Sequence, residues 1–201
     1  PESRKPGYER ERIELLLVLS RESGRIGEHE AAERRASEAV DAATAIGDQA
    51  LLADALNRHA NTQQKDAPRR AVEQYERALV LYRGIGDYRG QANVHNNIAV
   101  LHTTAGAWDA AATAFETAIE LGRRAGGPDL WGLFVINLGV LHMKGGEHER
   151  ARDLFGEALA LFAGIGNTER QVYALYNLAH LDREGGRYEA AGELYEIAAT
   201  L

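Results

Sequence analysis

The chain has 201 residues, of which 45% are hydrophobic and 26% charged, so neither a disordered nor a collagen-like protein is expected. It contains no cysteine, which excludes disulfides, zinc-thiolate sites and cysteine nucleophiles and is typical of a reducing, cytoplasmic compartment. A net charge of -7 argues against nucleic acid as the main partner, and no apolar run approaches the roughly 18 residues that span a membrane, so no membrane partner is expected.

Glycine is unusually frequent, with 21 residues against 4 prolines, and its positions reveal an internal repeat. Asn97, Asn137 and Asn177 follow one another at steps of forty residues. The same step relates the glycines Gly106, Gly146 and Gly186 and the alanines Ala118, Ala158 and Ala198. The period predicts a single array of five units, at about 8–48, 49–87, 88–127, 128–167 and 168–201, after a flexible segment, 1–7.

Each unit is predicted to form two amphipathic helices, because its apolar residues recur three and four positions apart. In the third unit, Ile98 and Leu101 mark the first helix, and Phe115 and Ile119 mark the second. A glycine just past a helix end supplies the left-handed backbone of a C-terminal cap, and a following Asp or Asn can cap the next helix. One hairpin alone buries too little surface to be stable, so neighbouring hairpins must stack into a superhelix with a concave groove.

Small and aromatic residues occupy matched positions in the last three units. They are Ala99, Ala111, Phe115 and Ala118, then Gly139, Ala151, Phe155 and Ala158, then Ala179, Ala191, Tyr195 and Ala198. In this pattern the chain resembles the tetratricopeptide repeat family, and most of all the forty-residue repeats of kinesin light chains, Pins-type adaptors and bacterial peptide-pheromone receptors. The resemblance implies an all-α fold, a right-handed superhelical solenoid of about five helix-turn-helix hairpins and about ten antiparallel helices, which binds a protein or peptide in its groove.

The first two units depart from this pattern. Repeat 1 has Val18 where the later repeats have asparagine. In repeat 2, counting forty residues back places Asn57 in the asparagine position, whereas aligning Ala60 with Ala99 requires a one-residue deletion in the turn and places Arg58 there. The sequence leaves these two alignments open.

The first helix of each later repeat is expected to face the groove with residues three, four and seven positions apart. The candidate ligand-contacting residues are Asn93, Asn96, Asn97, Val100, Leu133, Ile136, Asn137, Val140, Lys144, Tyr173, Tyr176, Asn177 and His180. The asparagine row can hold the backbone of an extended peptide or, alternatively, bind a neighbouring repeat and fix the superhelix. Tyr173 and Tyr176 are candidate anchors for a ligand or, alternatively, residues that pack between helices.

No set of residues predicts catalysis, a cofactor or a metal site. His102 and His142 occupy equivalent positions in successive repeats, which places them in parallel rows rather than around one ion. The segment that begins at His29 resembles the start of a zinc-protease helix but lacks the second histidine. We therefore expect a chain that is not an enzyme.

The sequence thus predicts a non-catalytic interaction module within a larger regulatory or signalling protein, which binds a peptide segment or a partner helix in the groove. The alternative is a structural spacer or a self-association element of that protein. The chain stops inside or just after a second helix, without a polar capping helix. Its last apolar face, formed by Leu194, Ile197 and Leu201, is therefore expected to meet further repeats, another domain or a second copy.

Overall fold

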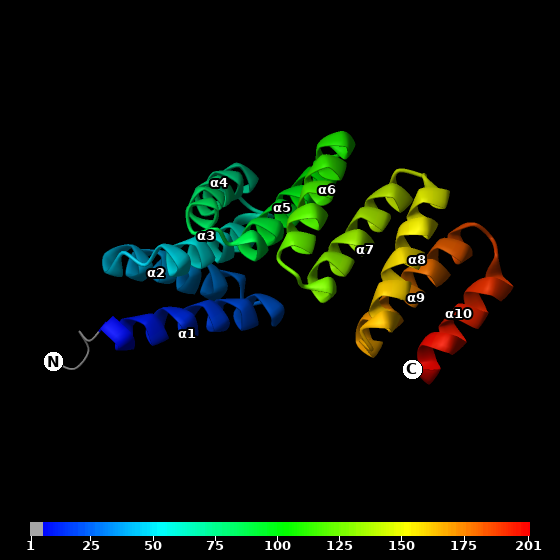
Figure 1. Cartoon of the computed structure of the whole chain (residues 1–201). Helices are drawn as coiled ribbons and strands as arrows, with labels where there is room; N and C mark the ends of the chain where they lie inside the picture. The colour runs from blue at the N-terminus through cyan, green and yellow to red at the C-terminus, as the bar shows by residue number, and fades with distance from the viewer. Residues whose placement is uncertain (1–5) are drawn as a thin grey trace. The chain divides into compact units, whose positions relative to one another are not determined.

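A computed structural model describes residues 6–201, which form ten α-helices and, in that range, no β-strand (Figure 1). The helices are α1 (Pro6–Arg25), α2 (His29–Ile46), α3 (Gln49–Gln63), α4 (Pro68–Gly84), α5 (Tyr88–Thr104), α6 (Trp108–Arg124), α7 (Pro128–Lys144), α8 (His148–Gly164), α9 (Thr168–Glu184) and α10 (Tyr188–Thr200). The predicted all-α fold of paired helices is confirmed. Residues 1–5 of the predicted flexible segment lie outside the described residues, and α1 already begins at Pro6.

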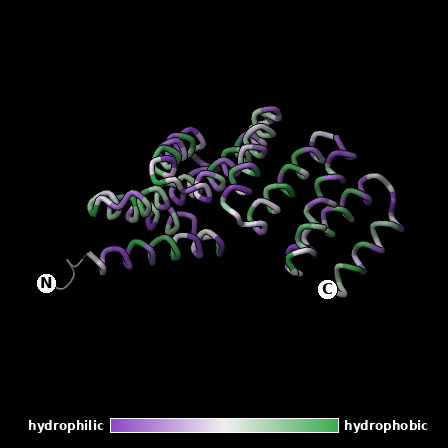
Figure 2. Tube along the Cα trace, viewed as in Figure 1, coloured by the Kyte–Doolittle hydropathy of each residue, from purple (hydrophilic) through white to green (hydrophobic). Residues whose placement is uncertain are grey.

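None of the ten helices is both long enough and apolar enough to cross a membrane. Hydrophilic and hydrophobic residues alternate along the helical trace, as Figure 2 shows. This alternation is typical of helices that bury one face and expose the other.

The chain divides into two compact units, of which the first ends at Leu101 and the second begins at His102, near the end of α5. In the first unit, α1 packs against α2 and α3, and α3 packs against α2 and α4. One apolar cluster joins α3, α4 and α5 around two fully buried tyrosines, Tyr75 and Tyr82. A second cluster joins α1, α2 and α3 around Ile13. The first unit is therefore held by burial of apolar side chains between helices that are close in sequence.

In the second unit, α7 packs against α6, α8 and α9, and α9 packs against α8 and α10. The pairing of a small residue with an aromatic residue, predicted from the repeat, is present where α7 meets α8. A Cβ atom added to Gly139 would lie 2.5 Å from Cε1 of Phe155, whose side chain is 0% exposed. The absence of a side chain at Gly139 thus lets the Phe155 ring lie directly against the backbone of α7.

Glycines end most of the helices, as the sequence predicts. Among the described residues, only glycines have positive φ: Gly27, Gly47, Gly86, Gly106, Gly126, Gly146, Gly166 and Gly186. At Gly86 (φ 70°), the next backbone N–H, that of Asp87, donates to the carbonyl of Tyr82 at 2.9 Å and closes the end of α4. The Asp87 side chain then accepts from the N–H of Gly90 at 2.9 Å and caps α5. The glycine and the residue after it thus end one helix and begin the next.

Candidate functional site

The predicted ligand-contacting residues belong to the first helices of the hairpins. Within each unit, the surface of these helices is here called the first-helix face: α1, α3 and α5 in the first unit, and α7 and α9 in the second. It is described separately for each unit. In the first unit, Nδ2 of Asn97 donates to Oδ1 of Asn57 at 3.1 Å and to Oδ1 of Asn61 at 2.9 Å. Nδ2 of Asn96 lies 3.5 Å from Oδ1 of Asn97, and Val100 is 38% exposed. These bonds tie α5 to α3, which supports the structural role for Asn97.

The helix bounds favour one of the two alignments of repeat 2. Helix α3 begins 39 residues before α5, whereas α4 begins 40 residues before α6. One residue is therefore missing from the turn between α3 and α4, which also lacks a glycine with positive φ. Ala60 and Ala99, both 0% exposed, then occupy equivalent positions. This alignment places Arg58 in the position that Asn97 occupies in α5, and Asn57 in that of Asn96.

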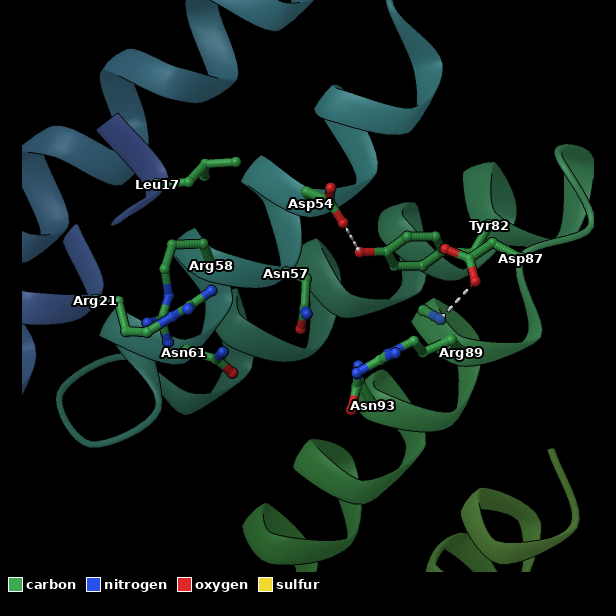
Figure 3. A pocket seen from close by; sticks show the side chains of 11 residues that line it. Leu17, Arg21, Asp54, Asn57, Arg58, Asn61, Tyr82, Asp87, Arg89 and Asn93 are labelled. Atoms are coloured by element: carbon green, nitrogen blue, oxygen red, sulfur yellow. Dashed lines mark hydrogen bonds between the residues drawn. The ribbon is translucent and has the colours of Figure 1, made fainter. Parts of the chain in front are cut away.

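A cavity of about 320 Å³ opens on the first-helix face of the first unit (Figure 3). Three arginines line it, Arg21 from α1, Arg58 from α3 and Arg89 from α5, and we call it the arginine cavity. Its other lining residues are Leu17, Asp54, Asn57, Asn61, Tyr82, Asp87, Gly90 and Asn93. Of the predicted contact residues, the structure places Asn93 in this lining.

Two carboxylates lie in the arginine cavity, and each has a donor of its own. The hydroxyl of Tyr82 donates to Oδ1 of Asp54 at 2.6 Å, and Asp87 caps α5. Desolvation by the surrounding protein raises the pKa of Asp54. The negative charges of Asp87 and Asp48 raise this pKa further, whereas the hydrogen bond from Tyr82 lowers it. Burial, reinforced by the charge of Asp54, likewise raises the pKa of Tyr82. The Tyr82 hydroxyl therefore remains a donor to Asp54 at neutral pH.

In the second unit, the first-helix face carries an apolar hollow of about 620 Å³ between α7 and α9. We call it the tyrosine hollow. It is lined by Leu133, Glu169, Arg170, Val172, Tyr173 and Tyr176. Tyr173 is 42% exposed and Tyr176 is 53% exposed. The Tyr176 ring also lies 5.9 Å, between centroids, from that of Tyr195 on α10. The structure thus brings Leu133, Tyr173 and Tyr176 together, as the helical spacing predicts.

Two predicted contact residues of the second unit are buried instead of facing the surface. Ile136 is 0% exposed and belongs to a buried stretch of α7 that also includes Phe134 and Val135. Asn177 is 7% exposed, and its Nδ2 donates to the backbone carbonyl of Tyr173 at 2.7 Å within α9. The prediction that these two side chains reach a ligand is therefore wrong for this structure.

The remaining predicted residues of the second unit differ in exposure. Asn137 and Val140 are half-buried on α7, and Lys144 is exposed at its end. His180 is half-buried on α9, with Nδ1 3.8 Å from Oε1 of Glu184. None of these four lines the tyrosine hollow.

The histidines do not form a metal site in the part of the chain that the structure describes, where no group of three or more His, Cys, Asp or Glu residues could hold an ion. His142 instead has Nδ1 3.3 Å from Oε1 of Glu147, at the turn between α7 and α8.

On the last helix, Leu194 is half-buried, whereas Ile197 is 50% exposed and Leu201, directly after the helix, is 53% exposed. The face predicted to self-associate therefore presents two apolar side chains to solvent.

Known protein families match these helical hairpins. Two tetratricopeptide repeat family models match residues 92–129 and 132–200, which together make up more than half of the chain. The chain is a tetratricopeptide repeat protein. A model of anaphase-promoting complex subunit 5 matches residues 13–66, on α1 to α3. No curated protein matches the chain in sequence.

Several solved structures share this tetratricopeptide fold. BtubC (BKLC) from P. vanneervenii is 23% identical, with a TM-score of 0.76 over 94% of this chain and 78% of that one. A Rap protein complexed with competence and sporulation factor is 19% identical, with a TM-score of 0.81 over 94% of this chain and 53% of that one. A signal transduction ATPase with a tetratricopeptide repeat sensor, from Pyrococcus horikoshii, is 18% identical, with a TM-score of 0.78 over 92% of this chain and 28% of that one. The chain thus spans about half of the Rap protein and less than a third of the ATPase.

Proposed function

We propose that this tetratricopeptide chain is a non-catalytic interaction module that binds a peptide segment or a partner helix on its first-helix face. The tyrosine hollow carries the proposal, because it combines an apolar recess with two half-exposed aromatic rings. Tyrosine offers a large contact area at a low cost in side-chain entropy, and a few such residues dominate many protein interfaces. The Rap protein that shares this fold was solved with competence and sporulation factor, which lends support to a peptide ligand here.

The composition of the hollow indicates how a ligand would be held. Leu133 and Val172 provide an apolar floor that an apolar side chain of a peptide can cover. Glu169 and Arg170 add charged groups to the lining, where they can orient the peptide backbone or a polar neighbour of the buried side chain. We therefore expect peptides with an apolar or aromatic anchor residue.

A selection from a random twelve-residue peptide library on the full chain, followed by fluorescence anisotropy of the selected peptides, tests this function. The double change Tyr173→Ala and Tyr176→Ala should weaken binding by about 30-fold, the loss expected for one hot-spot residue or more. Tyr188→Ala is the matched control, because Tyr188 is 72% exposed on α10 and is no part of the hollow. Failure to select any peptide, or an equal loss in the control, would overturn the proposal.

A second candidate function is self-association through the last helix, which the exposure of Ile197 and Leu201 favours. A second copy that covers these side chains would remove apolar surface from water. Sedimentation velocity should then show a dimer that Ile197→Glu converts to a monomer. A monomer at every concentration of the unchanged chain would exclude this function.

A further inference from the structure

Helix α1 carries an exposed apolar stripe, formed by Tyr8, Leu15 and Leu19 and here called the α1 stripe. The three residues follow one another at intervals of seven and four positions, which places them on one side of the helix. They are between 39% and 57% exposed. Helix α1 packs against α2 and α3, and the exposure of the stripe places it outside both contacts. The stripe is therefore apolar surface that a partner can cover.

The later hairpins show that the equivalent positions are normally covered. Leu15 and Leu19 lie twelve and eight residues before Gly27, the glycine with positive φ between α1 and α2. The residues at the same distances before the corresponding glycines are Val94 and Ile98 on α5, Phe134 and Leu138 on α7, and Ala174 and Leu178 on α9. Ile98 is half-buried, and the other five are at most 8% exposed. The positions that are open in α1 are thus closed in the later first helices.

Each of these later first helices packs against the second helix of the preceding hairpin. In the second unit, α7 packs against α6 and α9 packs against α8. In the first unit, Val94 belongs to the apolar cluster that includes α4, and Ile98 packs against that cluster. Leu15 and Leu19 therefore have the position and the apolar character of residues that receive a second helix.

Helix α10 presents the complementary open face. Ala198 is half-buried, whereas the preceding alanines at steps of forty residues are all 0% exposed: Ala158, Ala118 and Ala78. Leu201 is 53% exposed, whereas the preceding leucines at the same steps are half-buried: Leu161, Leu121 and Leu81. In the part of the chain that the structure describes, no helix follows α10 and closes this face.

The two open faces are the two halves of one repeated contact. The packing of α8 against α9 would be repeated if α10 took the place of α8, and α1 of a second copy took the place of α9. Leu15 is larger than its α9 equivalent, Ala174, but Phe134 on α7 shows that this position accepts a larger side chain. A contact between two α10 helices would leave the α1 stripe exposed, so the pairing of α10 with α1 accounts for both faces.

We infer that α10 of one copy packs against the α1 stripe of a second copy. This inference rests on the second candidate function, self-association, since it names the surface that the last helix meets. The two surfaces differ, so the interface is heterologous, and a dimer keeps one open face at each end. Association therefore continues past the dimer unless the copies close into a ring.

Sedimentation velocity of the full chain over a wide range of concentrations tests the inference. The unchanged chain should form dimers and, at higher concentration, larger species. Leu15→Glu on α1 and Ala198→Glu on α10 should each weaken association at least about tenfold, because each places an unpaired carboxylate in an apolar contact. Val80→Glu is the matched control, because Val80 is 66% exposed on α4 and belongs to neither face. Circular dichroism checks folding, and Leu201→Glu replaces Ala198→Glu if that variant does not fold.

A mixture of the two variants tests the pairing itself. Leu15→Glu keeps an intact α10 face, and Ala198→Glu keeps an intact α1 stripe. Mixed in equal amounts, the two variants should form a one-to-one dimer and nothing larger, although each alone is a monomer. If Leu15→Glu instead associates like the unchanged chain while Ala198→Glu is a monomer, self-association through the last helix stands and the role of the α1 stripe is wrong.

Other outcomes separate this inference from the proposed functions. A monomer at every concentration of the unchanged chain would overturn the inference together with the second candidate function. Absence of a mixed dimer, or an equal loss in Val80→Glu, would overturn the inference alone. Binding of library peptides through Tyr173 and Tyr176 does not require association, so the leading function stands or fails by its own test.

Discussion

Replacing Gly139 by alanine tests whether the close approach of α7 and α8 depends on the missing side chain. The added Cβ would lie 2.5 Å from Cε1 and 2.8 Å from Cδ1 of Phe155, well inside the roughly 3.5–4.0 Å that two carbon atoms prefer. Because the Phe155 ring is 0% exposed, it cannot swing into solvent, and the helices themselves must shift. Such overpacking costs about 1–3 kcal/mol, while alanine returns about 1 kcal/mol of helix propensity over glycine.

The expected net effect of Gly139→Ala is a loss of about 0–2 kcal/mol in the free energy of unfolding. Gly156→Ala is the matched control, because Gly156 lies inside α8 with nothing within 4 Å of an added Cβ. It should stabilise the chain by up to about 1 kcal/mol through propensity alone. The difference between the two variants, about 1–3 kcal/mol, isolates the steric cost.

Urea denaturation followed by tryptophan fluorescence measures this difference. The signal reports on the second unit, which contains both tryptophans, Trp108 and Trp131, as well as both substituted glycines. The midpoints convert to free energies as long as the slope with urea is the same in both variants. If Gly139→Ala and Gly156→Ala shift the midpoint equally, the close approach of α7 and Phe155 does not constrain residue 139, and the reasoning fails.

Two further predictions concern charged and titratable groups. Asp182 is 3% exposed and accepts hydrogen bonds from Arg152 and Arg187. Asp182→Ala should therefore lower the free energy of unfolding, measured by urea denaturation, by about 1–3 kcal/mol. The control Asp153→Ala, at an exposed site, should change it little. Burial lowers the pKa of His59 and His95 in the folded chain, so the unfolded chain binds protons first as the pH falls. The free energy of unfolding should therefore decrease as the pH falls below about 6.5, until the pH has passed the pKa values of the folded chain. Changing both histidines to Gln should flatten this pH dependence. An unchanged slope of the free energy of unfolding against pH would refute the prediction.

The sequence predicted the hairpins well, because their signals are local. A glycine with positive φ and the Asp or Asn cap that follows it involve only a few consecutive residues, as at Gly86 and Asp87. The end of one helix and the start of the next can therefore be predicted from a short stretch of sequence. The pairing of Gly139 with Phe155 could also be predicted, because the forty-residue step repeats the same contact. The resemblance to the tetratricopeptide repeat family depends on the same repeated positions of small and aromatic residues.

The surface was predicted less completely, because exposure depends on contacts between helices. Ile136 shares the helical spacing of Leu133 but is fully buried, since a helix packed on several sides has a narrow exposed stripe. Arg21 was missed, because repeat 1 lacks the asparagine that marks the first-helix face elsewhere. One of the two alignments of repeat 2 placed Arg58 in the asparagine position and so predicted that it lies on the first-helix face. The sequence left both alignments open, and the bounds of α3 and α5 favour this one.

Within each unit, the helices pack mainly against the next helix and the next but one in the chain. Such contacts need no closure of long loops, so folding can begin in any hairpin and spread to its neighbours. The same arrangement bears on how the chain can change in evolution. A duplication or deletion that runs from one glycine corner to the next but one, as from Gly86 to Gly126, adds or removes a whole hairpin without separating distant partners. The binding surface of such a protein can therefore grow or shrink by one repeat at a time while the remaining hairpins keep their packing.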